Sequence, residues 1–170
     1  MTRSDFMIKW GVYALAILPI WFLEVYVLNR LPVLGVTPML MPLAAVAAAV
    51  LEGATGGAGY GLFVGILCDA AYHGTNGAMT LGLCLLGMAA GALAQYALRQ
   101  NLVGCLLCSL GALLCIDAVR VAVHLLRGSA SLGARLRVAV PEALWSMVFV
   151  VPVYALYLWV FHRVPKRTVL

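Results

Sequence analysis

Long apolar runs, separated by short polar or glycine-proline breaks, restrict the fold of this chain more than any other feature. Of its 170 residues, 65% are hydrophobic and only 10% are charged, whereas soluble domains are about half apolar and about a quarter charged. A bilayer has a hydrocarbon core about 30 Å thick, and each helical crossing requires about 20 mostly apolar residues. The sequence therefore predicts an all-α integral membrane protein.

The apolar runs predict six transmembrane helices packed as one compact bundle. We expect them at residues 10–28, 33–51, 54–72, 78–98, 102–126 and 138–161. Only Glu52 and Gly53 part the second run from the third, so one long re-entrant element is the alternative there. Two crossings are favoured because about 40 apolar residues are twice what one crossing requires. We expect residues 1–170 to form a single polytopic membrane domain.

An even number of spans places both termini on the same side of the membrane. By this topology the terminal side carries six basic residues, namely Arg3, Lys9, Arg99, Arg163, Lys166 and Arg167. The opposite side carries four, namely Arg30, Arg127, Arg135 and Arg137. Because cytoplasmic loops carry an excess of Lys and Arg, we expect both termini in the cytoplasm.

A repeat of glycines marks the third predicted span. One small or polar residue recurs every four positions, in the order Gly53, Gly57, Gly61, Gly65, Asp69 and His73. Such residues share one helix face, and repeated GxxxG spacing lets another backbone approach closely inside a membrane. We interpret the face as tight packing within this chain, with contact to another protein as the alternative. Gly87, Gly91 and Gln95 predict a similar small face on the fourth span.

Charged residues inside the predicted spans require partners. A carboxylate at the centre of a membrane helix costs about 2.5–3.5 kcal/mol on insertion scales. Asp69 therefore requires a partner or a function, although its place near the end of the expected span lowers the cost. Spacings of three and four residues place Asp117, Arg120 and His124 on one stripe of the fifth span. We expect the stripe to face the interior and Arg120 to pair with Asp117, its simplest partner, or with an acid on a neighbouring helix. Glu24 and Glu142 add two acids near span ends.

No enzymatic motif accompanies these charged residues. Two intramembrane aspartates raise the hypothesis of an aspartyl protease, whose paired carboxylates would share a proton. The Asn-Xaa-Xaa-Asp-Arg core of lipoprotein signal peptidases is absent, since the chain reads Asp117-Ala-Val-Arg120. Gly-Xaa-Gly-Asp is absent too, because Gly65-Ile-Leu-Cys precedes Asp69. Serine-hydrolase and zinc-protease motifs do not occur either. We expect a protein that is not an enzyme.

All five cysteines lie inside apolar runs, where cysteine behaves as a small hydrophobe. Cys105 and Cys108 form a CxxC pair, but a structural zinc site requires four ligands. We therefore interpret the pair as apolar packing and expect no metal and no cofactor.

Three consecutive segments carry a family resemblance. Pro38-Met-Leu-Met-Pro42 opens the second helix, and Gly61-Leu-Phe-Val-Gly65-Ile-Leu-Cys-Asp69 closes the third. A short turn with Gly77 then leads into the next apolar helix, in the run Thr75-Asn-Gly77-Ala-Met-Thr-Leu81. In order and spacing these segments resemble the bacterial rod shape-determining protein MreD family. The closing stretch 141–154 is similar to the last helix of that family.

The resemblance implies a non-enzymatic subunit of the elongasome, the machinery that couples cell shape to peptidoglycan synthesis at the bacterial plasma (inner) membrane. The implied partners are MreC and, through it, MreB, RodA and its penicillin-binding transpeptidase, with no role for nucleic acid. Members of the family also resemble, in fold, the S-components of energy-coupling-factor (ECF) transporters. The alternative is therefore a small-molecule-binding S-component.

Overall fold

A computed structural model describes residues 3–30, 38–71, 77–96, 101–126 and 132–163 of the chain, with the side chains of 3–6, 29, 124–126 and 132–139 left undescribed. Every regular element in these ranges is a helix. Their order is α1 (Arg3–Phe22), the π-helix η1 (Leu23–Val27), the 3-10 helix η2 (Leu28–Arg30), α2 (Leu40–Ala71), α3 (Ala78–Tyr96), α4 (Leu102–Leu126), α5 (Leu132–Val148) and α6 (Val150–Arg163).

Several of these helices can cross a bilayer. Four segments are long and apolar enough, namely Met7–Val27, Leu40–Ala71, Ala78–Tyr96 and Leu102–Val123. The bent pair Val140–Val148 and Val150–Arg163 adds a fifth if it forms one span. The chain is therefore an all-α membrane protein with four or five candidate spans in the described residues.

Helix α2 folds back on itself at Gly53. This residue has φ 84° and ψ −174°, a conformation that glycine adopts without the steric cost of a β-carbon. Cys68 Sγ consequently lies 3.7 Å from Met41 Sδ, although residues so far apart along a straight helix would be separated by about 40 Å. Residues 40–52 and 54–71 are thus two antiparallel arms, and the expected break at Glu52-Gly53 is where the chain reverses.

The first arm of α2 forms the centre of the molecule. Every residue from Pro38 to Leu51 is buried, with no face of the arm left exposed. A helix that is apolar on all sides is suited to complete enclosure, and the alanines at 44, 45, 47, 48 and 49 allow neighbouring helices to approach it. The arm rises only about 20 Å, which is less than the bilayer core.

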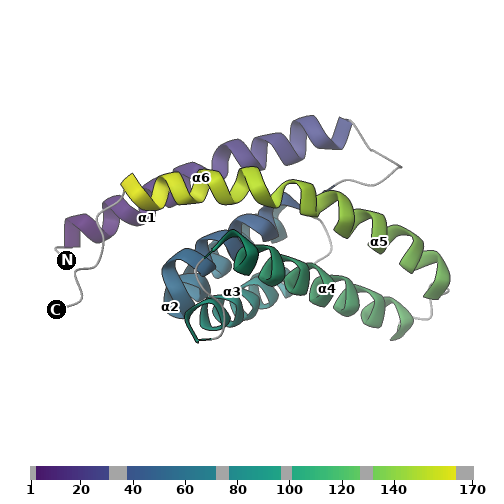
Figure 1. The fold of residues 1–170 in the computed structure, drawn as a ribbon. Coiled ribbons are helices and arrows are strands. Elements are labelled where there is room, and N and C mark those ends of the chain that lie inside the picture. The colour runs from purple at the N-terminus through teal and green to yellow at the C-terminus, as the bar shows by residue number, and fades with distance from the viewer. Residues whose placement is uncertain (1–2, 31–37, 72–76, 97–100, 127–131, 164–170) are drawn as a thin grey trace.

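The remaining helices pack around this central arm (Figure 1). Helices α1 and α6 run antiparallel side by side, with the rings of Tyr13 and Tyr157 5.9 Å apart. The α2 arms, α3 and α4 lie beside them, and α5 leads from the end of α4 to α6. The start of α1 and the end of α6 lie at the same end of the bundle, which we call the terminal end.

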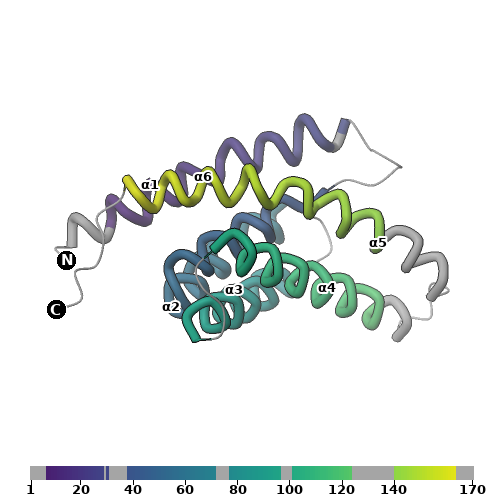
Figure 2. Tube along the Cα trace, in the orientation of Figure 1, coloured from purple at the N-terminus to yellow at the C-terminus, as the bar shows by residue number. Residues whose placement is uncertain are grey.

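The sixth predicted span is not one continuous helix. The structure bends by 44° between Val148 and Val150 (Figure 2). Pro152 lacks an N–H group and cannot donate to the carbonyl of Val148. The chain therefore closes a tighter turn from Phe149 N to Ser146 O (3.0 Å), and a new helix begins there. Helix α5 also begins at Leu132, inside the stretch 127–137 that the sequence predicts as a loop.

Candidate functional site

The glycine face of the second α2 arm lies directly against α3. A β-carbon added at Gly57, Gly61 or Gly65 would overlap backbone atoms of α3. The reverse also holds, since a β-carbon at Gly87 or Gly91 would overlap the α2 backbone. The two backbones pack so closely because neither carries side chains at these positions. The GxxxG spacing thus lies at an interface within this chain.

Asp69 continues this face and binds the first turn of α3. Its Oδ2 accepts hydrogen bonds from Thr80 N (2.9 Å) and Thr80 Oγ1 (2.5 Å). Thr80 is the third residue of α3, and the first four N–H groups of a helix have no partner within the helix. Asp69 therefore caps α3 from a neighbouring helix, and its negative charge lies at the positive end of the helix dipole.

Gly77 has a conformational role at the start of α3. Its φ is 81°, and a β-carbon added there would meet no atom within 4 Å. Its carbonyl accepts a hydrogen bond from Leu81 N (3.2 Å). Gly77 therefore serves the turn into α3, whereas Gly57, Gly61 and Gly65 serve close packing.

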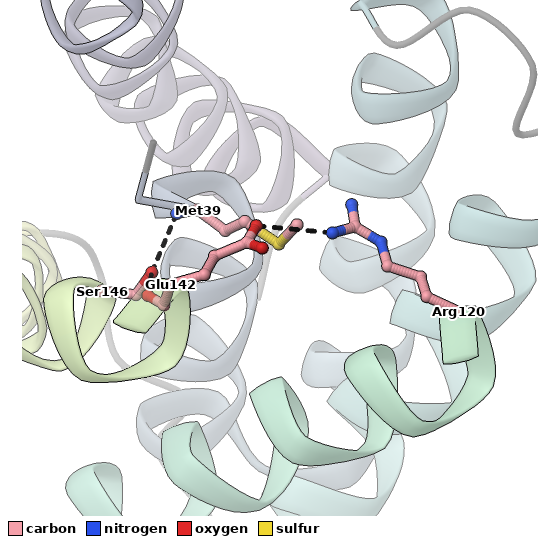
Figure 3. Close-up of polar contacts among 4 residues, drawn as sticks. All are labelled: Met39, Arg120, Glu142 and Ser146. Carbon is pink, nitrogen blue, oxygen red and sulfur yellow. Dashed lines mark hydrogen bonds and ion pairs between the residues drawn. The ribbon is translucent and has the colours of Figure 1, made fainter. Parts of the chain in front are cut away.

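A second cap lies at the buried N-terminus of α2. Glu24 Oε2 accepts hydrogen bonds from Leu40 N (3.2 Å) and Met41 N (2.8 Å). Ser146 Oγ accepts one from Met39 N (3.0 Å) (Figure 3). Because this helix end is enclosed, each amide left without a partner would cost about 1–3 kcal/mol. We call Glu24 and Ser146 the α2 cap.

Both members of the α2 cap occupy irregular stretches of helix. Glu24 is in the π-helix η1, whose wider turn interrupts the α-helical spacing of the first span. Ser146 lies at the end of α5, and its Oγ donates to the carbonyl of Glu142 (2.7 Å). Its own carbonyl accepts the bond from Phe149 at the bend. π-helical turns occur frequently at functional sites, and here one bears the carboxylate that satisfies two buried amides.

Arg120 is paired across two helices. Its Nη1 lies 3.4 Å from Glu142 Oε1, and the two side chains are 38% and 13% exposed (Figure 3). Asp117, the simplest partner by sequence, forms no ion pair within the described part of the chain. The guanidinium is paired instead with an acid on a neighbouring helix, which is the other partner that the sequence left open. The packing of α4 on α5 brings the longer Glu142 side chain to the guanidinium instead. The His124 side chain lies outside the described residues.

A buried cluster of tyrosines and one ion pair joins α1, α2 and α6. Lys9 Nζ pairs with Glu52 Oε2, and Tyr13 OH donates to Glu52 Oε1 (2.8 Å). Tyr60 OH bonds to the carbonyl of Tyr13 (3.0 Å) and lies 2.6 Å from Tyr157 OH. We call these five residues the tyrosine cluster. The sequence did not predict this cluster, and Lys9 was counted only as a charge that indicates topology. The one feature of the sequence that could have indicated the Lys9–Glu52 pair is that both residues lie near span ends on the same side of the membrane.

These contacts give the intramembrane carboxylates structural roles. Glu24 and Asp69 cap helices, while Glu52 and Glu142 bind cations of the same chain. Such groups stabilise helix positions by hydrogen bonds and charge pairing, and these partners offset the cost of a charge inside a membrane span. The candidate site is thus a set of polar contacts, which we call joints, that hold neighbouring helices together.

No family model, no curated protein and no solved structure matches this chain.

Proposed function

We propose that the chain is a non-enzymatic scaffold subunit of the bacterial elongation machinery, of the MreD type. In this proposal it lies in the plasma membrane with six spans and both termini in the cytoplasm. It couples MreC, and through it MreB, to the peptidoglycan enzymes RodA and its transpeptidase.

The observation that carries this proposal is the joint between α2 and α3. Two parts of the segments that carry the family resemblance, 61–69 and 77–81, meet where the glycine face packs on α3 and Asp69 binds Thr80. A carboxylate that serves as a helix cap supports a role in assembly, because catalysis or ion coupling would require it to titrate.

The six-span topology is supported by the reversal at Gly53. Helices α1, α3 and α4 give three passes, the two α2 arms give two more, and the bent α5–α6 pair gives the sixth. The short first arm occupies the centre, where it contacts protein on all sides.

The outward surfaces support a role that depends on membrane contacts. Large apolar side chains that are 50% or more exposed occur on several helices, among them Leu15, Leu81, Leu85, Val103, Leu107, Leu114 and Val119. In a bilayer such faces contact lipid or the transmembrane helices of partner proteins.

Affinity purification of the full chain from bacterial membranes tests the proposal. Cell-wall synthesis proteins, with MreC among them, are the expected companions, and depletion of the chain should convert rod-shaped cells into rounded ones. Recovery of a pair of ATPases with a coupling subunit would instead identify an S-component and overturn the scaffold function.

A further inference from the structure

The last turn of α6 presents an exposed cation–π pair. The guanidinium carbon of Arg163 lies 4.8 Å from the centroid of the Trp159 ring. Trp159 is 57% exposed, and both His162 and Arg163 are exposed. A cation–π contact holds a guanidinium over the ring while its N–H groups remain available to an acceptor.

This pair lies at the terminal end of the bundle, at a depth suited to the membrane interface. The nearby Tyr157 packs on Tyr13 at the middle of α1, so the last turn of α6 lies farther toward the terminal end. Tyr96, at the end of α3, is 88% exposed and follows Gln95, whose side chain binds Ala54 N beside the α2 reversal (3.4 Å). Exposed Trp and Tyr at helix ends are typical of the headgroup level.

The two ends of the bundle differ in charge. Lys9 is neutralised by Glu52 at the terminal end. Apart from this pair, the described side chains at the terminal end include one charged group, the cation Arg163. The described side chains of the other end are two cations (Arg30, Arg120) and four acids (Glu24, Asp69, Asp117, Glu142), a net charge of −2.

We propose that Trp159 and Arg163 form a binding site for the phosphate of an anionic phospholipid at the terminal end. The guanidinium donates to the phosphate oxygens, since its planar fork fits phosphate better than an ammonium does. The indole ring lies among the glycerol and acyl-chain carbons and holds the guanidinium at the phosphate level. The excess of positive charge at this end favours anionic over zwitterionic lipids. This inference does not depend on the proposed function.

Lipid-dependent thermal stability of the purified full chain tests the site. The protein is kept in a non-ionic detergent, and phosphatidylglycerol or phosphatidylcholine is added at matched concentrations. Phosphatidylglycerol should raise the unfolding temperature more than phosphatidylcholine does, because a ligand that binds only the folded state stabilises it. The difference in unfolding temperature between the two lipids should become smaller at high salt, because salt screens the attraction between charges.

Arg163→Gln should weaken the apparent affinity for phosphatidylglycerol about fivefold, which corresponds to the loss of about 1 kcal/mol for one basic residue near the headgroups. The matched control is Arg30→Gln, which changes an exposed arginine at the other end of the bundle and should leave the affinity unchanged. Trp159→Leu should also weaken binding, because it keeps an apolar side chain but removes the ring.

Three outcomes would overturn the site. Arg163→Gln could bind phosphatidylglycerol as tightly as the unsubstituted protein, or Arg30→Gln could lose as much affinity. Equal stabilisation by both lipids in the unsubstituted protein would exclude recognition of the anionic headgroup. Each variant is compared with itself in the two lipids, so a change in its basal stability does not obscure the result.

Discussion

At the scale of single residues, four carboxylates in the described part of the chain have a defined counterpart. Asp69 and Glu24 accept hydrogen bonds from the N-termini of α3 and α2. Glu52 and Glu142 are each paired with a cation on another helix. The insertion cost of an acid in a bilayer is thereby offset by contacts that also fix one helix relative to the next.

Substitutions at Asp69 distinguish capping from chemistry. Asp69→Asn keeps an oxygen that can accept from Thr80, so folding and partner binding should be largely preserved. Asp69→Leu removes the acceptor and should cost about 0.5–2 kcal/mol, the range for lost helix caps. The measurement is cell shape and partner recovery at matched membrane levels. Loss of function in Asp69→Asn with normal partner recovery would show that the carboxylate must titrate, which contradicts the capping role.

The pair between Arg120 and Glu142 predicts mutual compensation. Arg120→Ala should destabilise the protein by about 1–2 kcal/mol, less than the 3–5 kcal/mol of a fully buried pair, because the Arg120 side chain is 38% exposed. Adding Glu142→Gln should restore part of the folded protein in the membrane, as quantified by blotting. Adding Asp117→Ala to Arg120→Ala should not restore folded protein. A rescue by Asp117→Ala alone would mean that Arg120 is paired within α4.

At the scale of the elements, the closest joint is the contact of the second α2 arm with α3. Small residues alternate across it so that the backbones nearly touch. Helix association in a bilayer depends on such van der Waals packing because lipid removes the hydrophobic driving force between helices. A hydrogen bond stabilises this contact at each end. Asp69 accepts one from Thr80 N at one end, and Gln95 accepts one from Ala54 N at the other.

Two glycines on the same arm provide a matched test of this joint. Gly61→Leu would place a side chain on the α3 backbone and should lower the unfolding temperature, since overpacking costs about 1–3 kcal/mol or more. Gly59→Leu should have little effect because a β-carbon there meets no atom within 4 Å. Thermal unfolding in detergent measures both. Equal destabilisation by the two variants would show that the loss of glycine itself, rather than close packing, is responsible.

At the scale of the whole molecule, two polar joints hold the layer of α1 and α6 against the rest. The tyrosine cluster lies toward the terminal end, and the α2 cap lies at the other. Both enclose the apolar first arm of α2, whose ends would otherwise leave polar groups inside the membrane without partners.

The orientation of the molecule predicts opposite labelling at its two ends. Ala78, the first residue of α3, and Asn101, just before α4, are both exposed and lie at opposite ends of the bundle. With the termini in the cytoplasm, a cysteine at position 78 should react with a membrane-impermeant thiol reagent in intact cells, and one at 101 only after permeabilisation. The unsubstituted protein, which has five free cysteines in its helices, provides the background. The reverse pattern would place the termini outside.

Hydropathy and local spacing predicted much of this fold. The expected span at 102–126 coincides with α4, and α3 begins at residue 78 as expected. The spacing of Gly57, Gly61 and Gly65 indicated the face that meets α3. These features can be read from the chain because crossing a bilayer is a local requirement: about 20 apolar residues and a backbone whose hydrogen bonds are satisfied within its own helix.

Only the tertiary structure decided which polar groups meet. Ser146 binds an amide 107 residues away, and Tyr60 reaches Tyr157 across 97 residues. The choice of Glu142 over Asp117 for Arg120, and the position of the bend beside Ser146, likewise follow from packing between α4, α5 and the buried end of α2. Hydropathy records how much of a helix is apolar, but many arrangements of the same helices bury that surface equally well. The enclosed charges and amides select among these arrangements, because each is costly until a distant partner reaches it.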